Sequence, residues 1–279
     1  MTALLAVASA LLVGGADFVG GVLSRTASAA RVAAVAQVIG LALAVPAALL
    51  VESERVTSTD AAWSVASGVA VGLGLVVFYT AMARGLISLV APVTAVIGAI
   101  VPVAYALGTG ERPGSAAVTG IALAIVAIAL VSLGPASLST VSAGLGALPL
   151  AAAAGCLFGL FYVCFARVHE DAGLWPVAIS RTASALVLLG LALAVTGGLA
   201  VGWSLVPRIA AIGALEVGAA VTLLLALQRG PVSVAAVLAS LYPVTTTFLA
   251  AFVLRERLRG LQLVGVALAL VAVVLISTA

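Results

Sequence analysis

The sequence predicts an all-α integral membrane protein with ten transmembrane helices, arranged as two inverted five-helix repeats. Three observations carry this prediction. Hydrophobic residues make up 65% of the chain and charged residues only 8%, whereas a soluble domain has about 45–50% and about 25%. Ten long stretches are almost entirely apolar, and one segment occurs twice along the chain. Only a lipid bilayer can cover this much apolar surface.

Each apolar stretch is long enough for a transmembrane helix, which needs about 20 residues. Helices are favoured over strands because an open strand leaves its backbone hydrogen bonds unsatisfied in hydrocarbon, and barrel strands alternate polar with apolar residues. The first stretch is read as a retained helix, since Met1-Thr2-Ala3 lacks the basic start of a signal peptide. The expected spans are 3–23, 29–51, 61–83, 86–108, 115–134, 146–166, 174–196, 204–228, 232–254 and 260–277.

The repeated segment covers residues 81–123 and returns without a gap at residues 226–268. Each copy lies in a half of five expected spans, and the uncharged, Ser-rich link at 135–142 separates the halves. An odd number of spans places the second copy upside down in the membrane, as in the inverted repeats of transporters. The expected repeats are residues 1–138 and 139–279. The matched positions are Ala81, Arg84, Gly85, Ser88, Glu111, Arg112, Gly120, Ala122 and Leu123 in the first copy, and Ala226, Arg229, Gly230, Ser233, Glu256, Arg257, Gly265, Ala267 and Leu268 in the second.

Small residues, prolines and tryptophans predict how the helices pack. Glycines four residues apart let two helix backbones approach closely, prolines inside spans kink a helix or free carbonyls toward a cavity, and tryptophans near span ends suit the headgroup level. The glycines are Gly68, Gly72, Gly155 and Gly159; the prolines are Pro46, Pro92, Pro102 and Pro243; the tryptophans are Trp63, Trp175 and Trp203.

Three ionisable residues inside the spans are the main candidates for a site: Asp17, Arg181 and Glu216. A charge at the bilayer centre costs about 2.5–3.5 kcal/mol, so such residues usually face a cavity or a partner. A carboxyl group in low dielectric holds a proton readily, which makes Glu216 a candidate for proton coupling or for binding a cationic solute. Arg181 is a candidate for binding a carboxylate or phosphate. The alternative is structural pairing of Arg181 with Glu216 and of Arg25 with Asp17.

Polar residues elsewhere in the spans complete the candidate site: Tyr79, Gln37, Tyr242 and Thr246. A buried tyrosine needs a partner for its hydroxyl, and threonine bonds either a ligand or its own helix backbone. Packing is the alternative role for each. The recurring Glu111 and Glu256 lie in loops beside arginines, where loop pairing or a topology signal is expected.

Several classes of function are disfavoured. The net charge of +3 comes from 12 scattered arginines, so no nucleic-acid partner is expected. Cys156, Cys164 and His169 do not form a zinc-binding pattern, and no phosphate-binding loop of an ATPase is present. We therefore expect no metal, no cofactor and no direct use of ATP.

The second half carries a family resemblance in Gln228-Arg229-Gly230, Ser233, Leu241-Tyr242-Pro243-Val244, Leu254-Arg255-Glu256-Arg257-Leu258 and Gly265. This pattern resembles the second half of an EamA-type transporter of the drug/metabolite transporter superfamily. The first half resembles the unit more loosely: it has Ala83-Arg84-Gly85 and Gly110-Glu111-Arg112, but Gly98 occupies the position equivalent to Pro243. The resemblance implies a ten-helix exporter or importer of small solutes, with a central cavity and both termini in the cytoplasm. The arginine distribution favours the opposite orientation, because the loops then placed outside hold seven arginines and the others four.

The sequence therefore predicts a secondary active transporter in the plasma or inner membrane. It would move a small polar metabolite or drug-like solute by alternating access, with proton coupling as one option and membrane lipid as a further partner. The oligomeric state is left open. A lipid flippase or an intramembrane enzyme is the alternative, although an enzyme would need a convergent set of nucleophile and base, or paired acids, and the acids here are isolated.

Overall fold

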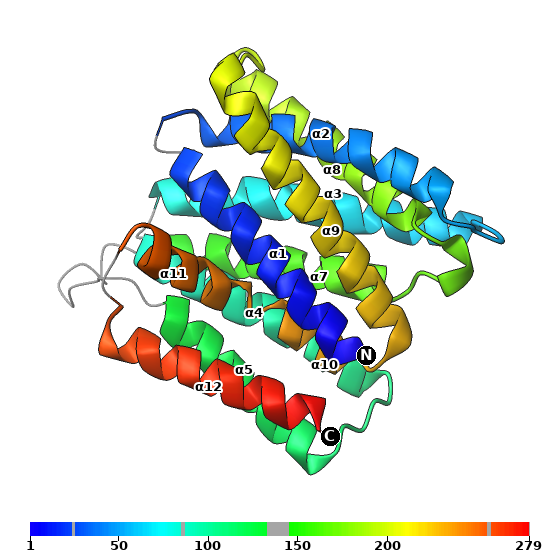
Figure 1. Cartoon of the computed structure of the whole chain (residues 1–279), viewed down its shortest axis with the longest axis vertical. Helices are drawn as coiled ribbons and strands as arrows, with labels where there is room; N and C mark the ends of the chain where they lie inside the picture. Colours follow the sequence, from blue (N-terminus) through cyan, green and yellow to red (C-terminus); the bar gives the residue numbers. More distant parts are fainter. Residues whose placement is uncertain (24–25, 85–86, 133–144, 256–257, 279) are drawn as a thin grey trace.

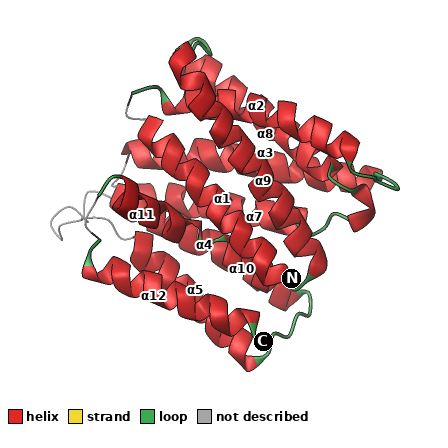
Figure 2. Ribbon diagram, in the orientation of Figure 1, coloured by secondary structure: helices red, strands yellow, loops and turns green. Residues whose placement is uncertain are grey.

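The computed structural model describes residues 1–23, 26–84, 87–132, 145–255 and 258–278, and all regular structure in these ranges is helical (Figure 2). The link at 135–142 and the pair Glu256 and Arg257, singled out in the sequence, lie outside the described residues. The main helices are α1 (Thr2–Leu23), α2 (Ala29–Leu50), α3 (Ser58–Arg84), α4 (Ile87–Gly108), α5 (Ser115–Ser132), α7 (Leu148–Phe165), α8 (Trp175–Thr196), α9 (Val206–Arg229), α10 (Val232–Ala239), α11 (Tyr242–Val253) and α12 (Gly260–Ser277).

Ten spans in the described residues are long and apolar enough to cross a membrane, which confirms the predicted fold class of an all-α membrane protein. The predicted boundaries differ from these helices by a few residues at most, apart from the ninth span. The three tryptophans lie at or near helix ends, as expected: Trp63 in the second turn of α3, Trp175 at the start of α8 and Trp203 just before α9.

The ninth span is two helices, α10 and α11, and not the single kinked helix that the sequence predicted. α10 ends at Ala239, four residues before Pro243, which lies in the first turn of α11. A proline has no N–H to donate, and its ring clashes with the carbonyl four residues earlier. The chain turns through Ser240 and Leu241 before the helix resumes. By contrast, α4 runs unbroken through Pro92 and Pro102.

The helices that pack together come in matched pairs between the two halves (Figure 1). In chain order, α1, α2, α3, α4 and α5 of the first half correspond to α7, α8, α9, the pair α10 and α11, and α12 of the second half. The contact of α1 with α9 therefore corresponds to the contact of α7 with α3. In the same way, the contact of α4 with α7 corresponds to the contact of α10 and α11 with α1. The contacts of α5 with α12 and of α2 with α8 each join equivalent helices of the two halves, so they stay the same when the halves are exchanged. The packing is therefore nearly unchanged when the halves are exchanged.

Glycines at equivalent positions form these contacts. A Cβ added at Gly120 would lie 2.6 Å from Ile276 Cγ1, and one added at Gly265 would lie 2.7 Å from Val131 Cγ2. Both glycines and both partners are separated by the repeat interval of 145 residues. The four glycines predicted to make close helix contacts do so: Gly68 and Gly72 lie against α8, and Gly155 and Gly159 lie against α4.

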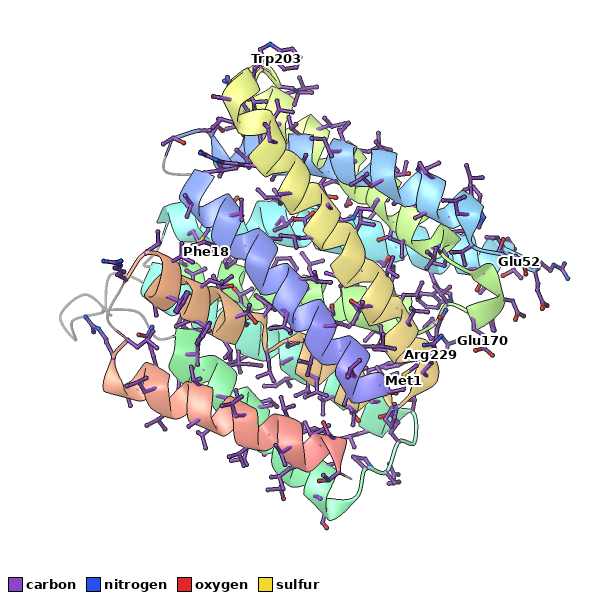
Figure 3. All side chains as sticks on the ribbon, in the orientation of Figure 1. Met1, Phe18, Glu52, Glu170, Trp203 and Arg229 are labelled. Atoms are coloured by element: carbon purple, nitrogen blue, oxygen red, sulfur yellow. The ribbon has the colours of Figure 1, made fainter. Side chains whose placement is uncertain are left out.

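One end of the bundle holds both chain termini, and we call it the terminal end. Figure 3 shows Met1, Glu52, Glu170 and Arg229 toward this end, away from Trp203. The hydroxyl of Thr2 donates a hydrogen bond to the carbonyl of Arg229 (3.0 Å), which places the C-terminus of α9 beside the N-terminus of α1. α3 begins at the terminal end and has Arg84 as its last residue, so Arg84 lies at the opposite end from Arg229.

Cysteine labelling tests this arrangement. In a background with Cys156 and Cys164 replaced by alanine, the variants R84C and R229C should react with a membrane-impermeant thiol reagent from opposite sides of the membrane. The physical reason is that the two positions are matched in the repeat but end helices that run in opposite directions. Labelling of both positions from one side would contradict the inverted arrangement.

Candidate functional site

Arg181 of α8 joins two other helices near the middle of the bundle. Its Nη1 donates to Glu216 Oε2 on α9 (2.6 Å) and to Gln37 Oε1 on α2 (2.6 Å). Gln37 Nε2 in turn donates to Glu216 Oε2 (3.4 Å), and Ser184 Oγ donates to Gln37 Oε1 (3.2 Å). The ion pair between Arg181 and Glu216, one of the alternatives left open by the sequence, is present. Ser184, one turn after Arg181, was not predicted.

A close approach of α2 and α9 makes this network possible. A Cβ at Gly213 would lie 2.8 Å from the carbonyl oxygen of Ala36 and 3.0 Å from the backbone nitrogen of Gly40, so the two backbones are nearly in contact one turn from Glu216. Exposure rises across the network: Gln37 is 4% exposed, the Arg181 side chain 11% and the Glu216 side chain 29%. Glu216 therefore forms the accessible side of the pair.

Asp17 lies on α1 beside this network. α1 crosses α9 here, since a Cβ added at Gly15 would lie 3.6 Å from Leu215 Cδ1. Asp17 interacts electrostatically with Glu216. Among the described residues, no hydrogen-bond or ion-pair partner of Asp17 is present, and the residue is exposed. The predicted alternative partner, Arg25, lies outside the described residues. Within the described ranges, Asp17 is thus a carboxylate without a countercharge next to a neutralised pair.

Two tyrosines complete the surroundings of Asp17. Tyr162 of α7 and Tyr242 of α11 both interact electrostatically with this carboxylate. Tyr162 forms a side-chain hydrogen bond with Ser240, in the turn between α10 and α11. Tyr162 follows Asp17 by the repeat interval of 145 residues, so the two occupy equivalent positions of the halves. Tyr162 was not among the residues predicted for the site.

The remaining predicted site residues have mixed placements. Gln37 belongs to the network, and Tyr242 lies beside Asp17. The hydroxyl of Thr246 lies 3.2 Å from the carbonyl oxygens of both Gly14 and Tyr242, so it bonds backbone and ties α11 to α1. Tyr79 lies within α3, but its side chain is outside the described residues.

Glu111 binds the start of α10. Its carboxylate accepts hydrogen bonds from the backbone N–H of Val232 (2.6 Å) and Ser233 (3.2 Å) and from the Ser233 hydroxyl (2.7 Å). A helix N-terminus has unpaired N–H groups and attracts negative charge. The predicted loop pairing beside Arg112 is therefore replaced by a cap that links the two halves, since this partner is 121 residues away in sequence.

A second contact between the halves lies at the terminal end. Thr57 and Asp60 bond each other's backbone N–H at the start of α3, which is a capping box. Asp60 Oδ1 also accepts a hydrogen bond from the His169 backbone (3.0 Å), and the ring Nδ1 of His169 lies 3.0 Å from the same atom. The guanidinium of Arg167 lies 5.5 Å from the centre of the Trp63 ring. These contacts hold the loop after α7 against α3.

An apolar groove of about 750 Å³ lies between α3 and α7, lined by residues such as Val65, Leu73, Leu157 and Leu160. Ser58 is its single polar lining residue. The groove does not include the ionisable network. In the described residues, no group of three or more His, Cys, Asp or Glu side chains is placed to hold a metal ion.

Residues 145–278 match the sequence model of the EamA-like transporter family. This segment runs from just before α7 to the end of α12 and includes Arg181, Glu216 and Tyr242. Residues 145–278 belong to the EamA-like transporter family. That family is part of the drug/metabolite transporter superfamily, so the predicted resemblance is confirmed.

A solved structure, titled a crystal structure of a protein, has the same fold as this chain. It matches with a TM-score of 0.76 at 19% sequence identity, over 99% of this chain and 96% of the other. At this identity the similarity shows the fold alone. No curated protein matches the chain.

The glycine contact beneath the network gives a stability prediction. Gly213→Ala should lower stability by about 1–3 kcal/mol, because the added methyl group meets backbone atoms that cannot move aside. The melting temperature of the purified protein in detergent measures the loss. Gly190→Ala is the matched control, because a Cβ there meets nothing within 4 Å. Equal melting temperatures for both variants would mean that the close approach of α2 and α9 is wrong.

The cap on α10 gives a second prediction. Glu111→Ala should lower stability by about 1–2 kcal/mol, because three donors lose a charged acceptor. Glu54→Ala, which removes an exposed acid from the same end, should have little effect on the melting temperature. If the two variants have the same melting temperature, Glu111 does not cap α10 in the membrane protein.

Proposed function

We propose that this EamA-type chain is a secondary active transporter that moves a small polar metabolite or drug-like solute across the plasma or inner membrane by alternating access. The observation that carries the proposal is the cluster of Asp17, Arg181 and Glu216 inside the bundle, where helices of both halves meet. The adjoining break between α10 and α11 resembles the discontinuous helices that form transporter sites near the bilayer midplane.

Energetics favour a ligand site over a purely structural cluster. Each ionised side chain costs about 2.5–3.5 kcal/mol to place at the bilayer centre. The Arg181–Glu216 pair offsets its own cost in part, but Asp17 adds a charge that nothing in the described bundle neutralises. Asp17 is exposed, and its electrostatic partners come from three other helices. This combination supports a water-accessible space between the helices.

The packing supports alternating access by two repeats, residues 1–138 and 139–279. The contacts are nearly unchanged when the halves are exchanged, and inverted repeats of this kind are the architecture in which one half rocks against the other around a central site. At the terminal end, the halves are joined by Thr2 with Arg229, Asp60 with His169, and Glu111 with the start of α10. We propose that these contacts separate when that end opens.

Glu216 is our candidate for coupling to protons. It is the accessible member of the ion pair, so a proton on Glu216 would release Arg181 and alter the network that joins α2, α8 and α9. Coupling would follow if the network rearranges between the two access states.

The variant Glu216→Gln tests this mechanism. It should abolish proton-driven transport while the folded protein remains in the membrane, because an amide, unlike a carboxyl group, cannot take up and release the coupling proton. A solute found by thermal-shift screening of the purified protein would be followed into proteoliposomes with and without a pH gradient. Glu216→Asp, which keeps the carboxyl group, is the control. Transport by Glu216→Gln with the pH dependence of the unmodified protein would remove Glu216 from the coupling mechanism.

A further inference from the structure

We propose that the site takes a solute with a single positive charge, an organic ammonium ion, and that Asp17 is its anionic anchor. This inference rests on the proposed transport function and names the substrate class. It starts from the charges that the fold gathers at one level of the bundle: two carboxylates, Asp17 and Glu216, and one guanidinium, Arg181.

The hydrogen bonds assign the countercharges. Arg181 Nη1 is 2.6 Å from Glu216 and 2.6 Å from Gln37, so the single cation of the cluster is committed to Glu216. The carboxylate left over is Asp17, which has no hydrogen-bond or ion-pair partner among the described residues. With all three groups ionised, the site has a net charge of −1. A solute with one positive charge neutralises it, whereas an anion adds to a charge that low dielectric already disfavours.

The neighbours of Asp17 also suit a cation. Tyr162 and Tyr242 both interact electrostatically with its carboxylate, and an aromatic ring attracts a cation to its face. Tyr162 is held by its hydrogen bond with Ser240, so the ring is positioned before a ligand arrives. A carboxylate with two tyrosines in its surroundings offers a charged anchor and aromatic groups nearby, a combination that suits an ammonium group.

A proton and the solute would compete for Asp17. In the part of the chain that the structure describes, the titratable groups that interact with it are Glu216, Tyr162 and Tyr242, with Arg181 paired to Glu216; of these groups, only Glu216 shares its negative charge. A protonated carboxyl no longer attracts a cation, so binding should weaken as pH falls and strengthen as pH rises.

The experiment compares matched compounds of different charge on the purified full-length protein. One set is phenethylammonium, phenethyl alcohol and phenylpropanoate; the other is choline and its uncharged analogue with carbon in place of the ammonium nitrogen. Binding is measured by the shift in melting temperature, and uptake of the same compounds is measured in proteoliposomes. The cations should bind about 10- to 100-fold more tightly than their uncharged partners.

Variants that change the net charge separate an electrostatic role from a structural one. Asp17→Asn and Glu216→Gln each bring the site to neutrality and should lose cation binding; in the second case Arg181 is released to neutralise Asp17. The double variant R181Q/E216Q returns the net charge to −1 and should regain binding. Asp17→Glu should retain it, and Glu54→Gln at the terminal end should not change it.

Tighter binding of the uncharged or anionic compounds would overturn the inference, and so would unchanged cation binding by Asp17→Asn or no gain in the double variant. If an anion or an alcohol is bound and taken up, the charge assignment fails while transport stands. If no compound of any class is bound or taken up, the inference and the proposed transport of small solutes fail together.

Discussion

Hydrocarbon offers no hydrogen bonds, and this constraint determines how the chain is built. Each backbone polar group in the membrane needs an internal partner, so the spans are helices and their interruptions are few. Where α10 begins, the carboxylate of Glu111 supplies the acceptor that a helix start lacks. Where Arg181 lies within a span, Glu216 and Gln37 accept its hydrogen bonds. Asp17 has no such partner in the described ranges, and for that reason it is the most informative residue of the site.

The two halves share a packing scheme but differ in chemistry. Gly120 and Gly265 make the same contact with Ile276 and Val131, in exchanged halves. In contrast, Asp17 is matched by Tyr162, and the helix break at Pro243 is matched by the unbroken α4. In the proposed mechanism, the symmetric packing is the part that rearranges, while the asymmetric side chains form the binding site. A transporter needs both properties, since the scaffold moves and the ligand remains the same.

The ninth span and Glu111 show where local reasoning was insufficient. Pro243 identified the site of distortion, but a kinked helix and a broken helix can have the same local sequence. The turn at Ser240 also depends on a tertiary contact, the hydrogen bond with Tyr162 of α7. Glu111 was expected to pair within its own loop, because sequence shows near neighbours and its actual partners are 121 and 122 residues away. The glycines were easier to place, because their spacing of four residues already defines one helix face.

The sequence by itself determined the membrane class, the helix positions, the repeat of 145 residues and the family, because apolar length and repeated motifs are properties of the chain read in order. It also placed Asp17, Arg181 and Glu216 within membrane spans, where a charged side chain needs a partner or a cavity. Only the tertiary structure decided which acid Arg181 neutralises and which acid has no countercharge among the residues that the structure describes. That choice depends on the near contact of two backbones at Gly213 and Gly40, on helices far apart in the sequence, and no local pattern contains it.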